Sequence, residues 1–394
     1  MSFGTLVVLV LAGLGGPLLG MVQRRFVPVV VGEILAGILV GPAVLDGFDP
    51  HNGTVAFLAQ IGFAMLMLTV GMHLPLRDLR LAESARDGAK LAVLVCVLAL
   101  PAGLLAASIA GDGHTAVYVV VLASGSAAVL LPAIEELGLE GAAVMTVMAQ
   151  VTIADVITIL SVPIVLQPSR VGHAVLGAVL VALAAVLLMA AARLTSRGTG
   201  GWVHRVRHLS KQRYWALDLR LSLLVLFVLA WVAQKGGTSI LIAGFGAGLM
   251  VAMIGGPKRL STQMRGVADG FFIPFYFVVL GAQLDLEGLV SEPAMLALAG
   301  ALALLNVAIH VLAAAVLRRP LSGALAATAQ LGVPAAVASI GLSEHVLAPV
   351  TATAIVVSAL VSLGVCTLGI ELLARPQTGA GADSAPEVGT PAAA

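Results

Sequence analysis

A succession of apolar runs, each close to the length of a membrane-crossing helix, occupies almost all of this 394-residue chain. An α-helix needs about 20 such residues to cross the hydrocarbon core of a bilayer. Only 10% of the residues are charged, whereas a soluble domain carries about 25%. The runs are rich in Leu, Ala, Val and Gly, and they do not show the segments of about 10 alternating residues that are typical of a membrane β-barrel. The sequence therefore predicts an all-α polytopic membrane protein.

Helix-breaking residues and polar stretches divide the chain into thirteen predicted spans. They cover residues 4–22, 26–44, 55–74, 89–110, 115–134, 141–166, 171–192, 214–233, 237–256, 268–284, 293–316, 321–343 and 347–372. The polar stretches 75–88, 193–213 and 257–266 are expected to be connecting loops. Residues 1–374 thus form one transmembrane domain. Residues 375–394, rich in Ala, Gly and Pro, are expected to be a disordered cytoplasmic tail.

The distribution of basic residues predicts the orientation in the membrane. If the N-terminus lies outside, every Lys and Arg except Arg170 and Lys235 falls on the cytoplasmic side. The positive-inside rule predicts this asymmetry, so we expect the C-terminus to be cytoplasmic and the protein to lie in the inner cell membrane. The basic stretch 193–213 then acts as a topology signal, and no nucleic-acid partner is expected.

Two predicted spans are interrupted by helix-breaking residues at their middle. Span five contains Ser124-Gly125-Ser126, and span twelve contains Gln330-Leu331-Gly332-Val333-Pro334. Because the two spans are seven apart, spans four to six and eleven to thirteen would be inverted repeats. Paired interruptions of this kind are typical of transporter binding sites, so we expect the two broken helices to cross near the middle of the membrane. The glycines of residues 244–248 are expected to serve helix packing instead.

Asp155 lies in the middle of span six, where a carboxylate costs about 2.5 to 3.5 kcal/mol and is a functional candidate by default. Thr152 and Thr158 stand three residues to either side on the same helix face. One acid and two hydroxyls suit a hard cation that prefers oxygen ligands. Asp155 can hold either a proton or a monovalent cation, which is what exchange requires. Ser124 and Ser126 are expected to add oxygen atoms to this site.

Three further polar residues, together with Gln330, are candidates for a coupling or charge-balancing role. His310 lies in span eleven, where it could pair with Asp155, sense pH or satisfy a local hydrogen bond. Asn306 precedes it by four residues and shares its helix face. Glu33 lies in span two before a glycine-rich stretch, where transport and helix packing remain open alternatives.

Several of these segments resemble those of the monovalent cation:proton antiporter-2 family. The residues that carry the resemblance are Val31–Pro42, Val70-Gly71-Met72 with Arg77-Asp78-Leu79, Ala123–Gly138, and Phe272–Asp285 with Phe275-Tyr276-Phe277 and Gly281. The resemblance covers nearly all of residues 5–372. It implies the sodium/proton antiporter fold, a homodimer with a dimerisation domain and an elevator-like mobile core domain, and regulation, where there is any, by a separate cytoplasmic subunit.

The chain departs from the family pattern at three places. Family members usually carry Asp, Asn or Gln before the acid of span six, whereas this chain has Ala154. His310 stands where many members carry a lysine, and Gln330–Gly332 replaces an Arg-Gly-Glu-like stretch. These departures bear on ion selectivity and stoichiometry, and not on the fold.

The sequence thus predicts a secondary transporter that exchanges Na⁺ or K⁺ for protons by alternating access. Proton-coupled transport of another small substrate on the same scaffold is the alternative, since a site lined by Ser124, Ser126, Thr152 and Gln330 could hold more than a bare ion. An enzyme is not expected, because an aspartyl protease needs two facing aspartates. No cofactor is expected. The partners expected are the cation, protons and lipid.

Overall fold

The computed structural model describes residues 1–22, 28–72, 79–168, 171–198, 216–236, 239–254 and 258–374. In these ranges the regular structure is entirely helical. The predicted tail 375–394 lies outside the described residues, as do several basic residues of the predicted loops, namely Arg24, Arg25, Arg77 and those between 199 and 215.

Each of the thirteen predicted spans coincides with a helix or with a pair of helical segments, so the predicted all-α polytopic fold is confirmed. In chain order the span elements are α1 (Phe3–Gly13) with α2 (Gly15–Val22), α3 (Val29–Val40), α4 (Gly53–Met72), α5 (Leu79–Ala110), α6 (Thr115–Ala123) with α7 (Ala127–Glu136), α8 (Ala142–Leu166), α9 (Val171–Gly198), α11 (Leu217–Lys235), α12 (Ile240–Ile254), the π-helical η2 (Ala268–Phe272) with α14 (Ile273–Ala282), α16 (Pro293–Val316), α17 (Leu321–Ala326) with α18 (Gly332–Ser343), and α19 (Pro349–Ala374). Eight helices in the described residues are long and apolar enough to cross a membrane.

The prediction of loops at 75–88, 193–213 and 257–266 was wrong in part. α5 begins at Leu79, and the polar turn before its apolar run stays helical, with Lys90 Nζ donating to Asp87 Oδ1 across 3.0 Å. α9 continues to Gly198. The third stretch forms α13 (Lys258–Val267), in which Met264 is buried and Gly266 is exposed. An amphipathic helix of this kind suits the membrane interface, where hydropathy alone does not reveal it.

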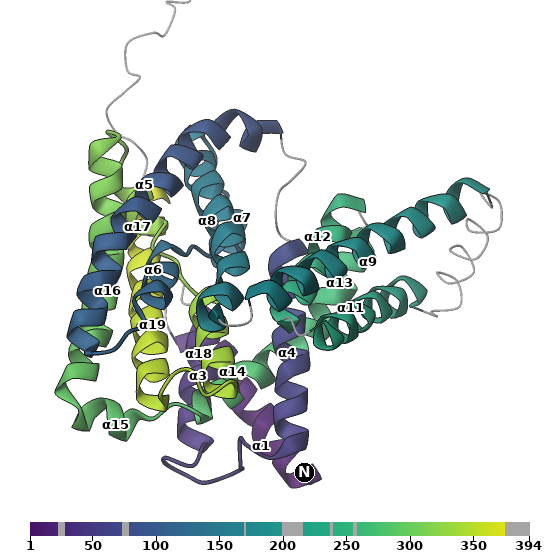
Figure 1. Ribbon diagram of the computed structural model, residues 1–394, viewed down its shortest axis with the longest axis horizontal. Helices are drawn as coiled ribbons and strands as arrows, with labels where there is room; N and C mark the ends of the chain where they lie inside the picture. Colours follow the sequence, from purple (N-terminus) through teal and green to yellow (C-terminus); the bar gives the residue numbers. More distant parts are fainter. Residues whose placement is uncertain are drawn as a thin grey trace, which may run out of the picture.

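The contacts between helices divide them into two groups. One contains α5 to α8 and α16 to α19, and the other contains α1 to α4, α9 and α11 to α14. In Figure 1, α9 and α11 to α13 extend to the right, away from α5, α16 and α19 on the left. Within the first group, α5, α6–α7 and α8 contact one another in the same pattern as α16, α17–α18 and α19. This matching pattern agrees with the predicted internal repeat of spans four to six and eleven to thirteen.

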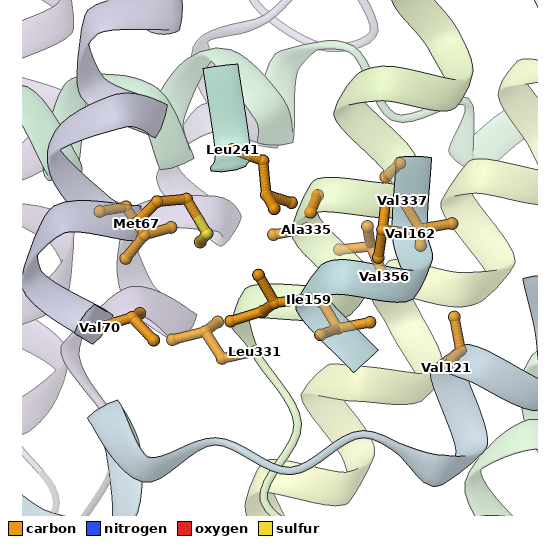
Figure 2. Packing of buried hydrophobic residues seen from close by; sticks show 14 of the residues in the cluster. Met67, Val70, Val121, Ile159, Val162, Leu241, Leu331, Ala335, Val337 and Val356 are labelled. Atoms are coloured by element: carbon orange, nitrogen blue, oxygen red, sulfur yellow. The ribbon is translucent and has the colours of Figure 1, made fainter. Parts of the chain in front are cut away.

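An apolar layer joins the two groups (Figure 2). Met67 and Val70 of α4 lie opposite Leu331, which directly precedes α18, and Ala335 in the first turn of α18. Ile159 of α8 is fully buried in the same cluster. Because these side chains are aliphatic or thioether groups, the layer excludes water. One buried polar bond crosses the same boundary, since the Tyr276 hydroxyl of α14 donates to the Ala335 carbonyl of α18 at 3.0 Å.

Glycines set the spacing inside the second group. A Cβ atom on Gly37 of α3 would lie 2.2 Å from the carbonyl oxygen of Val278 in α14, and one on Gly281 would lie 2.3 Å from that of Ile34. Close backbone approach of this kind is how helices associate in lipid. The glycine-rich stretch after Glu33 is therefore used for packing. Gly244 and Gly248 of α12 meet α4 in the same way, as expected.

We predict that Gly37→Ala lowers the free energy of unfolding by about 1–3 kcal/mol, because the added methyl group must push two backbones apart. The measurement is a thermal or denaturant unfolding midpoint of the purified protein in detergent. Gly364→Ala in α19 is the matched control, since a Cβ there meets no atom within 4 Å. Equal midpoints for the two variants would contradict the packing account.

Candidate ion site at the crossing of two broken helices

Asp155 lies at the centre of α8 with 1% of its surface exposed. Its Oδ2 accepts a hydrogen bond of 3.3 Å from the backbone N–H of Ala127. Ala127 is the first residue of α7, so the carboxylate faces the N-terminal end of a half-helix, where backbone N–H groups lack partners and the helix dipole favours negative charge. Asp155 Oδ1 has no hydrogen-bond partner among the described residues. One oxygen is therefore anchored and the other is available to a ligand.

The first interruption is confined to Ser124, Gly125 and Ser126, between α6 and α7. Ser124 and Ser126 have extended backbones and are fully buried. Ser124 Oγ donates to the Val121 carbonyl at 2.7 Å. Gly125 lets the chain lie against α8, since a Cβ there would be 3.1 Å from the Val151 carbonyl oxygen. The interruption predicted from sequence is confirmed, and it touches the helix that carries Asp155.

The two threonines beside Asp155 differ in their bonding. Thr158 Oγ1 donates to the Ala154 carbonyl at 2.7 Å, so its hydrogen is used within α8. Thr152 Oγ1 has no hydrogen-bond partner in the described part of the chain, although the residue is only 6% exposed. Because Thr152 and Asp155 are three residues apart on one helix, their two free oxygens lie on one face and can contact one ligand.

The second interruption separates α17 from α18 and reaches the first one through Gln330. Gln330 Nε2 donates to the Val121 carbonyl at 2.8 Å, in the last turn of α6. Asn306 of α16 supports the same segment, because its Nδ2 donates to the Thr328 carbonyl at 3.0 Å and to Ser362 Oγ at 2.9 Å. Neutral amides therefore tie the crossing together.

Three fully enclosed side-chain oxygens lack a hydrogen-bond partner in the part of the chain that the structure describes. They are Asp155 Oδ1, Thr152 Oγ1 and Asn306 Oδ1. A buried polar atom without a partner is costly, so most proteins satisfy nearly all of them. All three belong to the two helices, α8 and α16, that hold the crossing. Oxygen atoms in this state are suited to coordinate a cation.

His310 and Glu33 take places apart from Asp155. His310 Nδ1 bonds the Asn306 carbonyl at 2.8 Å, and Asp155 makes no hydrogen bond with it. The spacing of four residues between Asn306 and His310 was the sequence signal for this local bond. Glu33 is buried in α3, beside Gly16 of α2, and the Asp269 carboxylate is near enough to repel its negative charge. The structure thus brings Ser124, Ser126, Thr152, Thr158, Gln330 and Asn306 around the crossing, and it leaves Glu33 in the other helix group.

A vestibule opens between the two helix groups. It consists of cavities of about 730 Å³ and 300 Å³ that share Gln60, Ser339 and Ser343. Pro163 of α8 lines it, eight residues after Asp155, which is roughly 12 Å along the helix at 1.5 Å per residue. Its polar lining is mostly amide and hydroxyl groups, with Glu344 as the one carboxylate among the described lining residues. The sequence reasoning missed these residues, because single glutamines and serines near span ends carry no distinctive spacing.

A helical membrane protein with two broken helices that meet beside a buried carboxylate belongs to the class of inverted-repeat secondary transporters. Comparison with known proteins defines the class further. A family model described as "Sodium/hydrogen exchanger, transmembrane" matches residues 6–375, and the chain belongs to this family. The predicted relationship to cation:proton antiporters is therefore confirmed at the level of the sodium/hydrogen exchanger family.

Individual relatives have low sequence identity to this chain, but the similarity extends over about two thirds or more of its length. The "Na(+)/H(+)-K(+) antiporter GerN" of Bacillus cereus is 23% identical over 269 residues, which are 67% of each chain. The "Probable Na(+)/H(+) antiporter 3" of Methanocaldococcus jannaschii is 24% identical over 278 residues, or 68% of each chain. The solved structure of the sodium proton antiporter MjNhaP1 from the same organism matches with a TM-score of 0.63 at 17% identity, covering 94% of this chain and 95% of that one. This structural match confirms the predicted antiporter fold.

We predict that Asn306→Ala lowers the free energy of unfolding by about 1–3 kcal/mol, because the substitution removes two buried hydrogen bonds and takes the amide donor away from the Thr328 carbonyl. The unfolding midpoint in detergent measures this. Ser108→Ala is a suitable control, since Ser108 is exposed and bonds only within its own helix. A midpoint for Asn306→Ala that equals the control would show that the amide does not hold the crossing.

Proposed function

We propose that this protein exchanges a monovalent cation, Na⁺ or K⁺, for protons across the cell membrane by alternating access, with Asp155 as the shared binding site. The observation that carries the proposal is the pair of enclosed, unpartnered oxygens, Asp155 Oδ1 and Thr152 Oγ1, on one face of α8. The names of the relatives, which are antiporters of Na⁺, H⁺ and K⁺, support the same conclusion. Family and relatives are transporters and not enzymes.

The proposed exchange needs only this one carboxyl group. In one half of the cycle Asp155 carries a proton, and in the other half the proton leaves and a cation takes its place. Thr152 Oγ1 then contributes a neutral oxygen ligand, with Ser124, Ser126 and Thr158 as neighbouring oxygen donors. The N-terminal end of α7 holds the ionised carboxylate between the two steps. Gln330 and Asn306 hold the two broken helices in place at the crossing. His310 and Glu33 do not contact the ion in this proposal.

Access to Asp155 is proposed to alternate by movement between the two helix groups. The vestibule and the apolar layer both lie at their boundary, which supports a movement of one group past the other. We also propose that the protein lies in the inner membrane with its N-terminus outside and its C-terminus in the cytoplasm, as the basic residues indicate. A homodimer, and regulation by a separate cytoplasmic subunit, are part of the same proposal and rest on family resemblance.

Asp155→Asn is expected to abolish exchange. The test follows a ΔpH-sensitive dye in everted vesicles while Na⁺, K⁺ or Li⁺ is added, at matched expression. Wild-type protein should collapse the proton gradient on addition of its cation, and the variant should not. Glu287→Gln in α15 (Leu286–Ser291), an acid in a short helix that lies outside the crossing, should behave like wild type. If Asp155→Asn retains exchange, the site is wrong; if no cation acts on wild type, the function is wrong.

Competition between proton and cation for one carboxyl group predicts a pH dependence of affinity. On the acid side, the cation concentration for half-maximal exchange should rise about tenfold for each unit by which the pH falls, because one proton must leave before one cation binds. The maximal rate at saturating cation should change much less. Initial rates over a grid of pH and cation concentration measure both quantities. A half-saturation concentration that stays constant while the maximal rate falls would exclude a shared site.

One observation favours the alternative of another small substrate. The vestibule presents the amides of Gln60, Gln167 and Gln234 and few charges, and such a lining also suits a neutral or organic solute. A proton-coupled counterflow assay with candidate solutes separates the two proposals. Solute counterflow without a cation response in the dye assay would favour the alternative, and a cation response alone would exclude it.

A further inference from the structure

A second cavity lies inside the first helix group and is separate from the vestibule. It has a volume of about 160 Å³ and shares no lining residue with the two vestibule cavities. Its walls come from α5, α8, α16 and α17, and they are mostly apolar side chains and glycine, including Leu91, Val147 and Ala324. An apolar cavity of this size in a protein can bind a molecule as large as benzene.

Two polar side chains in the wall have unused hydrogen-bonding capacity. His310 is 3% exposed and lines the cavity, and its Nδ1 bonds the Asn306 carbonyl, which can only accept. Nδ1 therefore carries the hydrogen, and in the neutral ring Nε2 has a free lone pair. Gln150 of α8 is 4% exposed, lines the same cavity and makes no side-chain hydrogen bond with the described residues. One acceptor and one amide thus face a common space.

The charged groups at the cavity are already engaged with one another. Arg319 is the one charged side chain among the described lining residues, and it forms an ion pair with Asp87 of α5. Asp87 also pairs with Lys90 at 3.0 Å. The remaining polar lining group, Thr146, donates to the Ala142 carbonyl of its own helix. A ligand in the cavity would therefore contact neutral groups, apart from Arg319, whose charge is balanced by its ion pair with Asp87.

We propose that this cavity is a binding site for a small neutral alcohol or phenol. The apolar walls accept a ring or short alkyl body. A hydroxyl is the smallest group that can both donate to His310 Nε2 and accept from the Gln150 amide. The occupant touches α8, which carries Asp155, and α17, the first half of the second broken helix, so it acts on the helices of the crossing without entering the ion site. The proposal rests on the cavity itself and not on the transported substrate.

The test measures binding of para-fluorophenol to the purified full-length protein in detergent by ¹⁹F NMR, with empty micelles subtracted. Para-fluorotoluene is the matched probe, since it has nearly the same shape and no hydroxyl. We expect saturable binding of the phenol that is about fivefold tighter than that of the toluene, the advantage of one net hydrogen bond. In Gln150→Leu this ratio should fall toward one.

A cavity-filling variant completes the test. Ala143→Leu adds bulk to the cavity wall and should abolish saturable binding of both probes, whereas Ala294→Leu, the same change on an exposed face of α16, should leave it intact. Unfolding midpoints confirm that each variant is folded. Absence of saturable phenol binding to folded wild-type protein, equal affinities for the two probes, or binding unaffected by Ala143→Leu would each overturn the proposal. None of these outcomes depends on whether the protein exchanges cations.

Discussion

Two helices end inside the membrane, and the backbone groups that they release must find partners within the protein because lipid offers none. The side chains of Asp155 and Gln330 provide some of these hydrogen-bond partners. Asp155 accepts from the first N–H of α7, and Gln330 donates to a carbonyl in the last turn of α6. Asn306 supports the second interruption by donating to the Thr328 carbonyl. This requirement explains where the candidate ion site lies. The Asp155 carboxylate accepts the hydrogen bond from the N-terminal end of α7, and that position places it at the crossing of the two broken helices.

The hydrogen bonds of the crossing come mainly from neutral groups. Apart from Asp155, the side chains that tie the two interruptions to their neighbours are amides and hydroxyls. His310 bonds to its own helix instead of to the acid. A buried carboxylate with no opposing charge among the hydrogen-bonded groups around it can be balanced by a proton or by a bound cation. This shortage of fixed counter-charge is the physical basis of the exchange proposed here.

Sequence reasoning succeeded where the signal was local. The break at Ser124–Ser126 was predicted in place because glycine and its neighbouring serines disfavour a helix interior. The second break lies at residues 327–331, so the predicted stretch Gln330–Pro334 overlaps it only at Gln330 and Leu331; Gly332–Pro334 begin α18, because proline is tolerated in the first turn of a helix. The role of Asp155 as a candidate was evident because a carboxylate in an apolar run is expensive. The helical stretch at Lys258–Val267 was missed because its average composition is polar, and the burial of Met264 against neighbouring helices is a tertiary feature that composition does not reveal. The vestibule residues Gln60 and Ser339 were missed because they come from distant helices.

The sequence by itself determined that the chain is a bundle of membrane helices and that two of its spans are interrupted near their middle, because hydropathy and helix-breaking residues act over short distances. The tertiary structure alone decided which oxygen of Asp155 is anchored, that Thr152 is unpaired while Thr158 is not, and that His310 faces a separate cavity with Gln150. These facts depend on which helices meet and at what height, and close glycine contacts such as Gly125 against Val151 of α8 contribute to that arrangement. Contacts between residues more than two hundred positions apart, such as Gln330 with Val121, leave no local pattern in a single sequence.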